Sequence, residues 1–552
     1  MSYLLLALLL RALVTDPAPA PADLVLRSAK IWTADPARPS AEAIAVRAGR
    51  IIGIGSNDDV ERFRGPGTRT IDGRGRRVVP GFIDAHTHMS GGGFDLLAID
   101  LRRTRDPGEL TRIVADYAKT RPAGTWLTDG AWDHEQWTPP RLPTREMLDP
   151  ATGDHPACFS RQDGHMVVCN SLALRLAKID RTTPDPPGGV IVHDERGEPT
   201  GVLKDAAMDA VFSVRPARTP AELQGALRAA MRHAAGVGVT SVQDLPGDSG
   251  DLEAWEALRA SGGLTVRVHY RLPLASWEKA RDRRASMKND EWLRLGGVKG
   301  YADGSLGSST ALFDQPYSDE PGNRGVFASD AIPLSRMEER VAGADRAGLQ
   351  VVIHAIGDRA NAEILDLYDR VFRANGSRDR RFRIEHAQHL RQADIPRFAR
   401  LGVIASMQPY HAIDDGRWAE KRIGRERCRT TYAFRSLLDA GARLAFGSDW
   451  DVAPLSPIAG IDAAVTRRTI DGKNPRGWFP EQRIRVEEAL AAYTRGAAWA
   501  AFEEGEKGML STGKLADFVI LSGDLLSVPP ERIVDIRVET TVVGGKIVFP
   551  AP

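Results

Sequence analysis

The chain has 552 residues, and its 74 lysines and arginines against 73 aspartates and glutamates leave a formal charge of +1. This balance argues against a broad basic surface for nucleic acid or anionic lipid, because such binding is driven by clustered positive charge. Hydrophobic residues make up 42% of the sequence, which excludes a disordered or fibrous chain and is typical of a well-cored globular protein. The length predicts three or four domains at about 150 residues each, although a single α/β barrel often exceeds that size.

The first 22 residues form a signal-like segment. They contain the apolar run LLLALLL at 4–10, then Arg11, and end near Ala18-Pro19-Ala20. An exported protein often begins this way, but no basic residue precedes the run and Arg11 interrupts it. Two localisations therefore stay open, cytoplasmic or exported. The run is too short to span a bilayer, and no other stretch reaches about 18 uninterrupted apolar residues, so we expect no stable membrane span.

The three cysteines are Cys158, Cys169 and Cys428, and no C-x-x-C pair occurs. An odd number excludes a fully paired disulfide framework, and the spacing disfavours a zinc site built from cysteines. A bridge between Cys158 and Cys169 remains open for an exported protein. The sequence favours buried free thiols.

Both ends of the chain are expected to form short strands joined by glycine-centred turns. Such runs occur within 24–54 and within 516–549, where Gly544-Gly545 marks one turn. Neither end has enough strands for a stable sheet alone, whereas together they suffice for a small β-sandwich. We therefore predict a discontinuous domain made of residues 23–80 and 506–552, which encloses the segment between them.

Between these ends, short apolar runs that end in polar residues alternate with helical patterns. Eight such runs lie at 79–88, 237–245, 266–272, 298–305, 351–358, 382–388, 403–409 and 444–451. Alternation of strand and helix implies parallel pairing with right-handed crossovers, and eight strands are the number in a TIM barrel. The predicted fold class is therefore α/β. It comprises a (β/α)₈ barrel over 81–505, an inserted subdomain at about 95–232, and the β-sandwich from both chain ends.

Ionisable side chains occupy the ends of these predicted strands, where a barrel of this type places its active site. They are His86, His88, Lys299, His354, His386 and Asp449. His86 and His88 alternate along one strand, so both imidazoles point the same way. Two neutral imidazoles on one face form half of a site for a borderline metal such as zinc.

Seven motifs occur in order along the chain: PGFIDAHTHM, KGYADGSLGSSTALF, VVIHAIGDRA, RIEHAQHL, SMQPYH, GSDWDVAPLSP and GKLADFVIL. On these motifs the chain resembles the amidohydrolase superfamily, in particular the group of metal-dependent hydrolases similar to N-substituted formamide deformylases. The resemblance covers most of the chain and implies the same barrel that the strand count predicts.

The resemblance also implies a role for each candidate ligand. His86 and His88 would bind a more buried metal ion, and His354 and His386 would bind a second. Asp449 would bind the first ion and act as general base toward the attacking water. The expected cofactor is one or two divalent ions, most simply Zn²⁺, because imidazole and carboxylate ligands suit that ion.

In many members of the superfamily the residue that matches Lys299 is carbamylated and bridges both ions. An unmodified lysine would repel the metals, which would leave a single-metal site with Asp303 as the next carboxylate to consider. Three further residues are weaker candidates for contact with the substrate. His165 belongs to the insertion, and His411 follows the seventh strand. Trp132 stands in an aromatic stretch of the insertion, where it could wall an apolar pocket or pack in a buried core, and the sequence favours packing.

These expectations define a metal-dependent hydrolase of carbon–nitrogen bonds outside ordinary peptides, with a linear or N-substituted amide as its small-molecule substrate. The alternative enzyme activity is hydrolysis of a cyclic amide or deamination, because the same scaffold can serve either reaction. The alternative without enzyme activity is a protein that only binds a metal or a small molecule. The presence of Asp449, the expected general base, counts against this alternative. No nucleic-acid partner is expected, and assembly into a homo-oligomer is left open.

Overall fold

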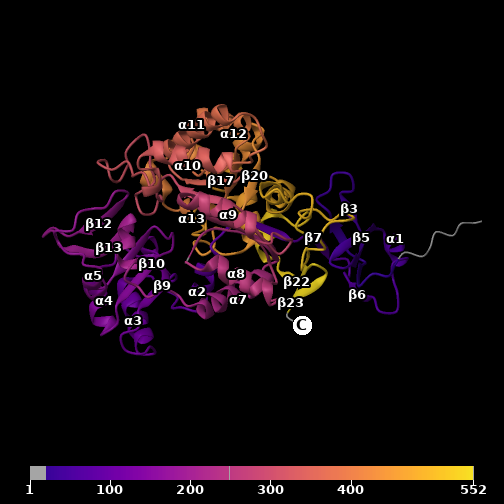
Figure 1. Ribbon diagram of the computed structural model, residues 1–552, viewed down its shortest axis with the longest axis horizontal. Coiled ribbons are helices and arrows are strands. Elements are labelled where there is room, and N and C mark those ends of the chain that lie inside the picture. Colours follow the sequence, from indigo (N-terminus) through magenta and orange to yellow (C-terminus); the bar gives the residue numbers. More distant parts are fainter. Residues whose placement is uncertain (1–19, 248, 551–552) are drawn as a thin grey trace, which may run out of the picture.

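The computed structural model describes residues 20–247 and 249–550, which form four β-sheets with helices around them (Figure 1). The apolar run of the signal-like segment falls within residues 1–19, outside the described part of the chain. None of the helices in the described part is long and apolar enough to cross a membrane.

The largest sheet is a parallel barrel whose strands neighbour one another in chain order. The strands are β8 (Phe82–Thr87), β14 (Val239–Asp244), β15 (Arg267–Pro273), β16 (Leu293–Tyr301), β17 (Gln350–Ala355), β18 (Arg383–His386), β19 (Ile404–Met407) and β20 (Leu444–Phe446). A parallel bridge between Thr87 and Trp450 brings the chain after β20 back to β8, so the sheet is nearly closed. The predicted (β/α)₈ barrel is confirmed.

Helices cover the barrel and bury the apolar outer face of its strands. The longer ones are α7 (Pro220–Gly236), α8 (Asp251–Ala260), α9 (Trp277–Ser286), α10 (Leu334–Arg346), α11 (Asp358–Asn375) and α16 (Pro457–Thr466). The start of α7 shows how the sequence specifies them. Thr219 caps the helix, Glu222 completes a capping box, and Pro220 occupies the first turn. Its buried face then packs into the same hydrophobic core as β8 and β14.

Two antiparallel-rich sheets are built from the chain ends, one from amino-terminal strands alone and one from strands of both ends. One contains β1 (Leu24–Arg27), β4 (Ala43–Arg47), β5 (Arg50–Gly55) and β6 (Arg69–Asp72). The other joins β2 (Lys30–Trp32), β3 (Ser40–Ala41) and β7 (Arg77–Pro80) to β21 (Phe518–Leu521), β22 (Val538–Val543) and β23 (Lys546–Phe549). Both sheets contribute to one hydrophobic cluster, in which Leu26 and Ile44 lie with Phe518 and Ile520.

Between β8 and β14 the chain forms a fourth sheet with its own hydrophobic clusters. Its strands are β9 (Leu127–Trp132), β10 (Ala157–Arg161), β11 (Met166–Cys169), β12 (Gly189–His193) and β13 (Pro199–Asp205), and α3 (Pro107–Ala118), α4 (Arg145–Thr152) and α5 (Ser171–Leu176) pack against them. Figure 1 shows this unit on the opposite side of the barrel from the sheets formed by the chain ends.

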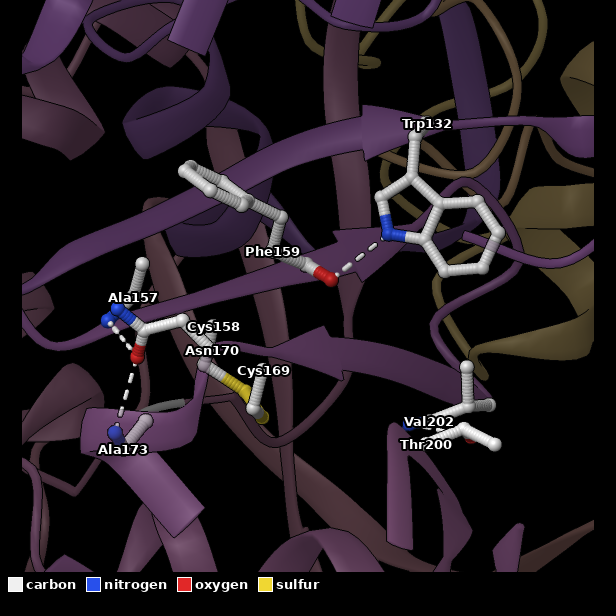
Figure 2. The surroundings of a disulfide bond; sticks show 9 residues. All are labelled: Trp132, Ala157, Cys158, Phe159, Cys169, Asn170, Ala173, Thr200 and Val202. Atoms are coloured by element: carbon white, nitrogen blue, oxygen red, sulfur yellow. Dashed lines mark hydrogen bonds between the residues drawn. A yellow bond between two sulfur atoms is a disulfide. The ribbon is translucent and has the colours of Figure 1, made fainter. Parts of the chain in front are cut away.

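A disulfide joins Cys158 of β10 to Cys169 of β11, while Cys428 is buried and free (Figure 2). The expectation of free thiols is therefore wrong for this pair. The two residues are direct partners in the antiparallel register, a relation that depends on the hairpin and not on the sequence spacing.

Replacing both Cys158 and Cys169 by alanine should lower the free energy of unfolding by about 3 kcal/mol, because the bond closes a loop of sequence separation 11 and restricts the unfolded chain. Denaturant unfolding with and without reductant measures the effect. Reductant should destabilise the wild type and a Cys428→Ala control, but leave the double variant unchanged. Equal midpoints for oxidised and reduced wild type would contradict the prediction.

Candidate metal centre

A cavity of about 870 Å³ opens at the carboxyl ends of the barrel strands. All six predicted strand-end residues line it, namely His86, His88, Lys299, His354, His386 and Asp449. Three of the four weaker candidates line it as well, namely His165, Asp303 and His411. The barrel thus gathers residues that are up to 363 positions apart in the chain.

His86, His386 and Asp449 form the tightest group. One ligand atom from each lies within 4.8 Å of the others. Asp449 Oδ1 is 3.1 Å from His86 Nε2 and 3.4 Å from Nε2 of His88. His386 and Asp449 have φ angles of 73° and 58°, a region that non-glycine residues rarely occupy and that is enriched at functional sites.

Hydrogen bonds orient two of the imidazoles so that Nε2 is available to the cavity. His86 Nδ1 is 2.6 Å from Glu385 Oε2, and His386 Nδ1 is 2.8 Å from Gln408 Oε1. An oxygen partner selects the tautomer with the proton on Nδ1, because neither a carboxylate nor an amide oxygen can donate. The lone pair of Nε2 is then free to bind a cation.

His354 has the opposite orientation. Its Nε2 lies 3.0 Å from the carbonyl oxygen of Gly304, so Nε2 donates and Nδ1 keeps the lone pair. Asp303 lies behind it, with Oδ1 3.5 Å from His354 Nε2. The Asp303 carboxylate accepts backbone N–H groups of Leu312, Ile356 and Gly357. Asp303 therefore holds together the loops around the cavity.

The cluster of His86, His386 and Asp449 fits a divalent metal ion, because it contains a buried polar atom that no group of the described chain satisfies. His86 Nε2 is buried, yet it has no hydrogen-bond partner among the described residues. Burial alone would raise the pKa of Asp449, but the adjacent imidazoles of His86 and His88 hold it well below its usual range. The Nε2 lone pair of His86 faces Asp449 Oδ1 at 3.1 Å, and two buried acceptors in contact are costly unless a cation satisfies both. Imidazole and carboxylate ligands suit zinc and similar ions.

Lys299 reaches the cavity from β16 with its side chain almost fully buried. Burial lowers its pKa to about 8, although Glu385 and Asp449 act in the opposite direction. Its Nζ lies 4.8 Å from the ring centroid of Tyr301, two residues further along the same strand. A substantial share of neutral amine therefore exists near pH 8.

Two candidate substrate residues flank this group. His165 Nδ1 is 2.6 Å from Asp205 Oδ1, and its ring centroid lies 5.1 Å from that of His354. His411 Nε2 lies 4.0 Å from Asp449 Oδ2 and lacks a hydrogen-bond partner within the described chain. Both imidazoles are thus placed beside the cluster and keep polar atoms available to a ligand.

Trp132 does not contact the candidate substrate site, contrary to its place among the weaker candidates. Its indole is fully buried in the core of the insertion, and Nε1 donates to the carbonyl oxygen of Phe159 at 2.8 Å (Figure 2). The side chain is at the end of β9 and packs against that core, because a large apolar ring gains more from burial there than from an open cavity wall. It does not line the cavity formed by the described residues.

Sequence reasoning did not single out Asp84, and it left Glu385, which precedes the expected ligand His386, open between supporting a ligand and lying at the surface. Glu385 is fully buried between His86 and Arg383, with Oε1 2.6 Å from Arg383 Nη2. The i, i+2 pair Arg383–Glu385 on a strand was the available signal, since both side chains share one face. Asp84 accepts the backbone N–H groups of His86 and Ser448, which ties β8 to the segment after β20.

The insertion also supplies charged residues to the cavity. Arg161 lies at the end of β10, and Asp163 and His165 lie in or beside the turn to β11. Arg161 Nη1 is 2.7 Å from Asp163 Oδ2, which also accepts from the hydroxyls of Ser305 and Ser308. These contacts fasten the hairpin to the barrel loop and place its tip over the strand ends.

A parallel eight-stranded barrel with imidazoles, a lysine and an aspartate at its carboxyl mouth defines the class of metal-dependent barrel hydrolases. The model of the amidohydrolase family matches residues 69–549, and the chain belongs to this family. The protein is accordingly a hydrolase of the metal-dependent amidohydrolase superfamily. This sets aside the non-catalytic binding protein considered from the sequence.

The chain is similar along almost its whole length to proteins from plants, bacteria and archaea. It is 41% identical to Protein LONG AFTER FAR-RED 3 of Arabidopsis thaliana, over 97% of this chain and 93% of the relative. It is 28% identical to N-substituted formamide deformylase of Arthrobacter pascens, over 95% and 97%. The crystal structure of an uncharacterized metal-dependent hydrolase from Pyrococcus horikoshii superposes with a TM-score of 0.75 at 28% identity, covering 92% and 99%.

Proposed function

We propose that the protein hydrolyses a carbon–nitrogen bond in a small linear or N-substituted amide. The observation that carries this proposal is the buried Asp449 carboxylate 3.1 Å from the unpartnered Nε2 of His86, in a cavity of about 870 Å³. A cavity of this size accommodates a small organic molecule with a substituent on nitrogen. Similarity to a relative named N-substituted formamide deformylase supports the choice of bond.

The proposed metal ligands are His86, His88, His354, His386, Asp449 and a carbamylated Lys299, for one or two ions, most simply Zn²⁺. A divalent ion held there would polarise the scissile carbonyl and lower the pKa of a water molecule toward about 7. The available lone pairs of His86, His386 and His354 support this assignment, because each ring is oriented by a hydrogen bond at its other nitrogen.

Side chains of the cavity carry out the proton transfer and hold the substrate. Asp449 takes the proton of the attacking water and passes it to the leaving nitrogen, which must be protonated to depart as an amine. His411, 4.0 Å from the other Asp449 oxygen, is positioned to hold a polar group of the substrate. Asp205 fixes the ring of His165, so that its outer edge can bind the substrate from the opposite wall.

The protein should contain one to two equivalents of zinc or a similar ion by elemental analysis, and chelation should lower its activity by at least about 100-fold. Activity is measured on a panel of N-substituted formamides, other linear amides, lactams and amino-substituted heterocycles, with and without Zn²⁺. Hydrolysis of the N-substituted formamides or of the other linear amides supports the proposal. Turnover confined to lactams or to deamination favours the alternative reaction, and full activity in metal-free protein overturns the mechanism.

Lys299→Ala should reduce the bound metal by one equivalent per chain, because the bridging carboxylate of the carbamate would be lost. Lys299→Glu, which restores a carboxylate at this position, should retain more metal than the alanine variant, and a short carboxylic acid added to the alanine variant should do the same. Elemental analysis of the three proteins provides the measurement. Equal metal content in wild type and Lys299→Ala would indicate a site in which Lys299 is not a ligand.

A further inference from the structure

A second cavity, of about 540 Å³, lies at the amino end of the barrel, away from the candidate metal centre. Its lining includes residues near the amino ends of three neighbouring strands: His269 of β15, Arg294 of β16 and Gln350 of β17. Asp379 contributes a carboxylate to the wall. Arg284 of α9 adds a further positive charge to the wall. The cavity therefore gives solvent a route to the floor of the barrel.

His269 at this floor is buried and has an unused polar atom. Its side chain is 4% exposed, and Nδ1 has no hydrogen-bond partner in the described part of the chain. The ring lies directly on Gly296, where a Cβ would come within 1.6 Å of the imidazole. Burial, together with the nearby Arg271 and Lys507, holds the pKa of His269 well below its usual value, so the ring is neutral and can carry its single proton on Nδ1.

Arg271 stands two residues further along β15, on the same face of the strand. Its side chain is fully buried, and Nη2 donates to Gln243 Oε1 at 3.3 Å and to Gln350 Oε1 at 2.9 Å. Nε and Nη1 have no partner among the described residues. Arg271 does not line the cavity itself, but Gln350, which accepts its hydrogen bond, does, so the guanidinium lies directly behind the cavity wall.

The other buried cations nearby are compensated. Arg383 Nη2 is 2.6 Å from Glu385, and Lys507 Nζ is 2.8 Å from Glu503. Within the described chain, Arg271 has no carboxylate within ion-pair distance. An arginine side chain stays protonated in proteins. Arg271 is therefore a buried positive charge with no contacting carboxylate, and Glu385, Glu503 and Asp244 act on it only from beyond ion-pair distance.

Arg467 shows how the same chain treats a buried arginine that binds no anion. It is also fully buried, but Nε, Nη1 and Nη2 donate to the carbonyl oxygens of Trp478, Tyr432 and Thr431. Each nitrogen of that guanidinium has a partner. Arg383 and Arg422 are buried as well and leave only Nε without a partner, whereas Arg271 leaves both Nε and Nη1.

We propose that the amino end of the barrel binds a small monovalent anion of chloride to formate size, held by Arg271 and His269. Three carbonyl oxygens surround the charge of Arg467, whereas Arg271 has two amide oxygens, both on Nη2. Water could satisfy the remaining N–H groups of Arg271, but an anion would also offset the buried charge, whose burial without compensation is costly. The site is separate from the proposed function and requires no metal.

The floor is also connected to the catalytic end of the barrel. Gln243 Oε1 accepts from both Arg271 and Arg383, Arg383 pairs with Glu385, and Glu385 holds His86. The anion would therefore balance a chain of buried charges that ends at the candidate metal centre.

Crystals of the full-length protein grown in bromide test the site directly. We expect an anomalous bromide peak within about 3.5 Å of Arg271 Nε or Nη1, a contact distance typical of a halide on an N–H donor. An ordered water or an empty site in 0.5 M bromide would overturn the proposal. This arm uses the wild-type protein and does not depend on any variant being folded.

Thermal unfolding supplies an independent readout. At constant ionic strength, exchange of gluconate for chloride should raise the wild-type Tm saturably by about 2 °C, because the ion binds only the folded chain. Arg271→Met should lose this response, whereas Arg467→Met should keep it. The same measurement with formate in place of chloride tests whether the site also accepts the larger anion. Equal responses of wild type and Arg271→Met would contradict the assignment of Arg271.

Discussion

Asp449→Asn should lower kcat by about 10³-fold while the protein remains folded, because positioned acid–base groups typically contribute about 10² to 10⁴ in rate. The amide is nearly isosteric with the carboxylate, but it cannot accept the proton of the attacking water. Asn can still place an oxygen near Nε2 of His86 and of His88, so much of the bound metal should remain. Steady-state kinetics with elemental analysis of the same sample measures both effects.

A matched control is Asp462→Asn. Asp462 is also buried, on α16 and outside the cavity, with Oδ1 3.7 Å from Arg468. This variant should keep wild-type kcat and report only the cost of removing a buried negative charge. Near-normal turnover in Asp449→Asn would remove the proposed base. A loss of turnover that follows the loss of metal would assign Asp449 to binding alone.

Glu385→Gln should lower the free energy of unfolding by about 3 kcal/mol, because it leaves the fully buried guanidinium of Arg383 without its counter-charge. It should also weaken metal binding by about 10- to 100-fold, the usual cost of losing the group that orients a histidine ligand. Glu385 Oε2, 2.6 Å from Nδ1 of His86, is that group. Denaturant unfolding measures the change in the free energy of unfolding, and competitive metal titration measures the change in metal affinity.

Glu338→Gln is the corresponding surface control. Glu338 pairs with Arg370 at 2.7 Å, but its side chain is 33% exposed and that of Arg370 is 49% exposed. Its loss should cost less than about 1 kcal/mol and leave metal affinity unchanged, because water screens and replaces an exposed ion pair. If Glu385→Gln were no more destabilising than this control, the buried pair would not be a structural requirement of the barrel.

The barrel could be predicted because its signals are local and repeated. Each strand is a short apolar run with a polar end, and helical patterns separate most of the runs, so parallel pairing follows from the order of elements. Strand limits were less certain. The fourth strand was expected at 298–305 but spans Leu293–Tyr301, since Leu293 and Leu295 are buried as well.

The line of ionisable residues at strand ends was equally visible, and all six of them line one cavity. The sequence could not show how they are oriented. That depends on partners from other strands, such as Gln408 for His386 and Gly304 for His354. It also could not separate Trp132, which is buried in the insertion, from residues that reach the cavity.

The amino-acid sequence by itself thus determined the α/β barrel, the family and the residue types of the candidate centre, because periodicity and motif order are properties of the chain. Only the tertiary structure decided which groups meet across strands. The register of β10 and β11 joined Cys158 to Cys169, and the barrel buried Arg383 against Glu385 while leaving Nε and Nη1 of Arg271 without partners among the described residues. Such pairings depend on distances between residues far apart in the chain, and hydrogen bonds and charge compensation act only over those distances.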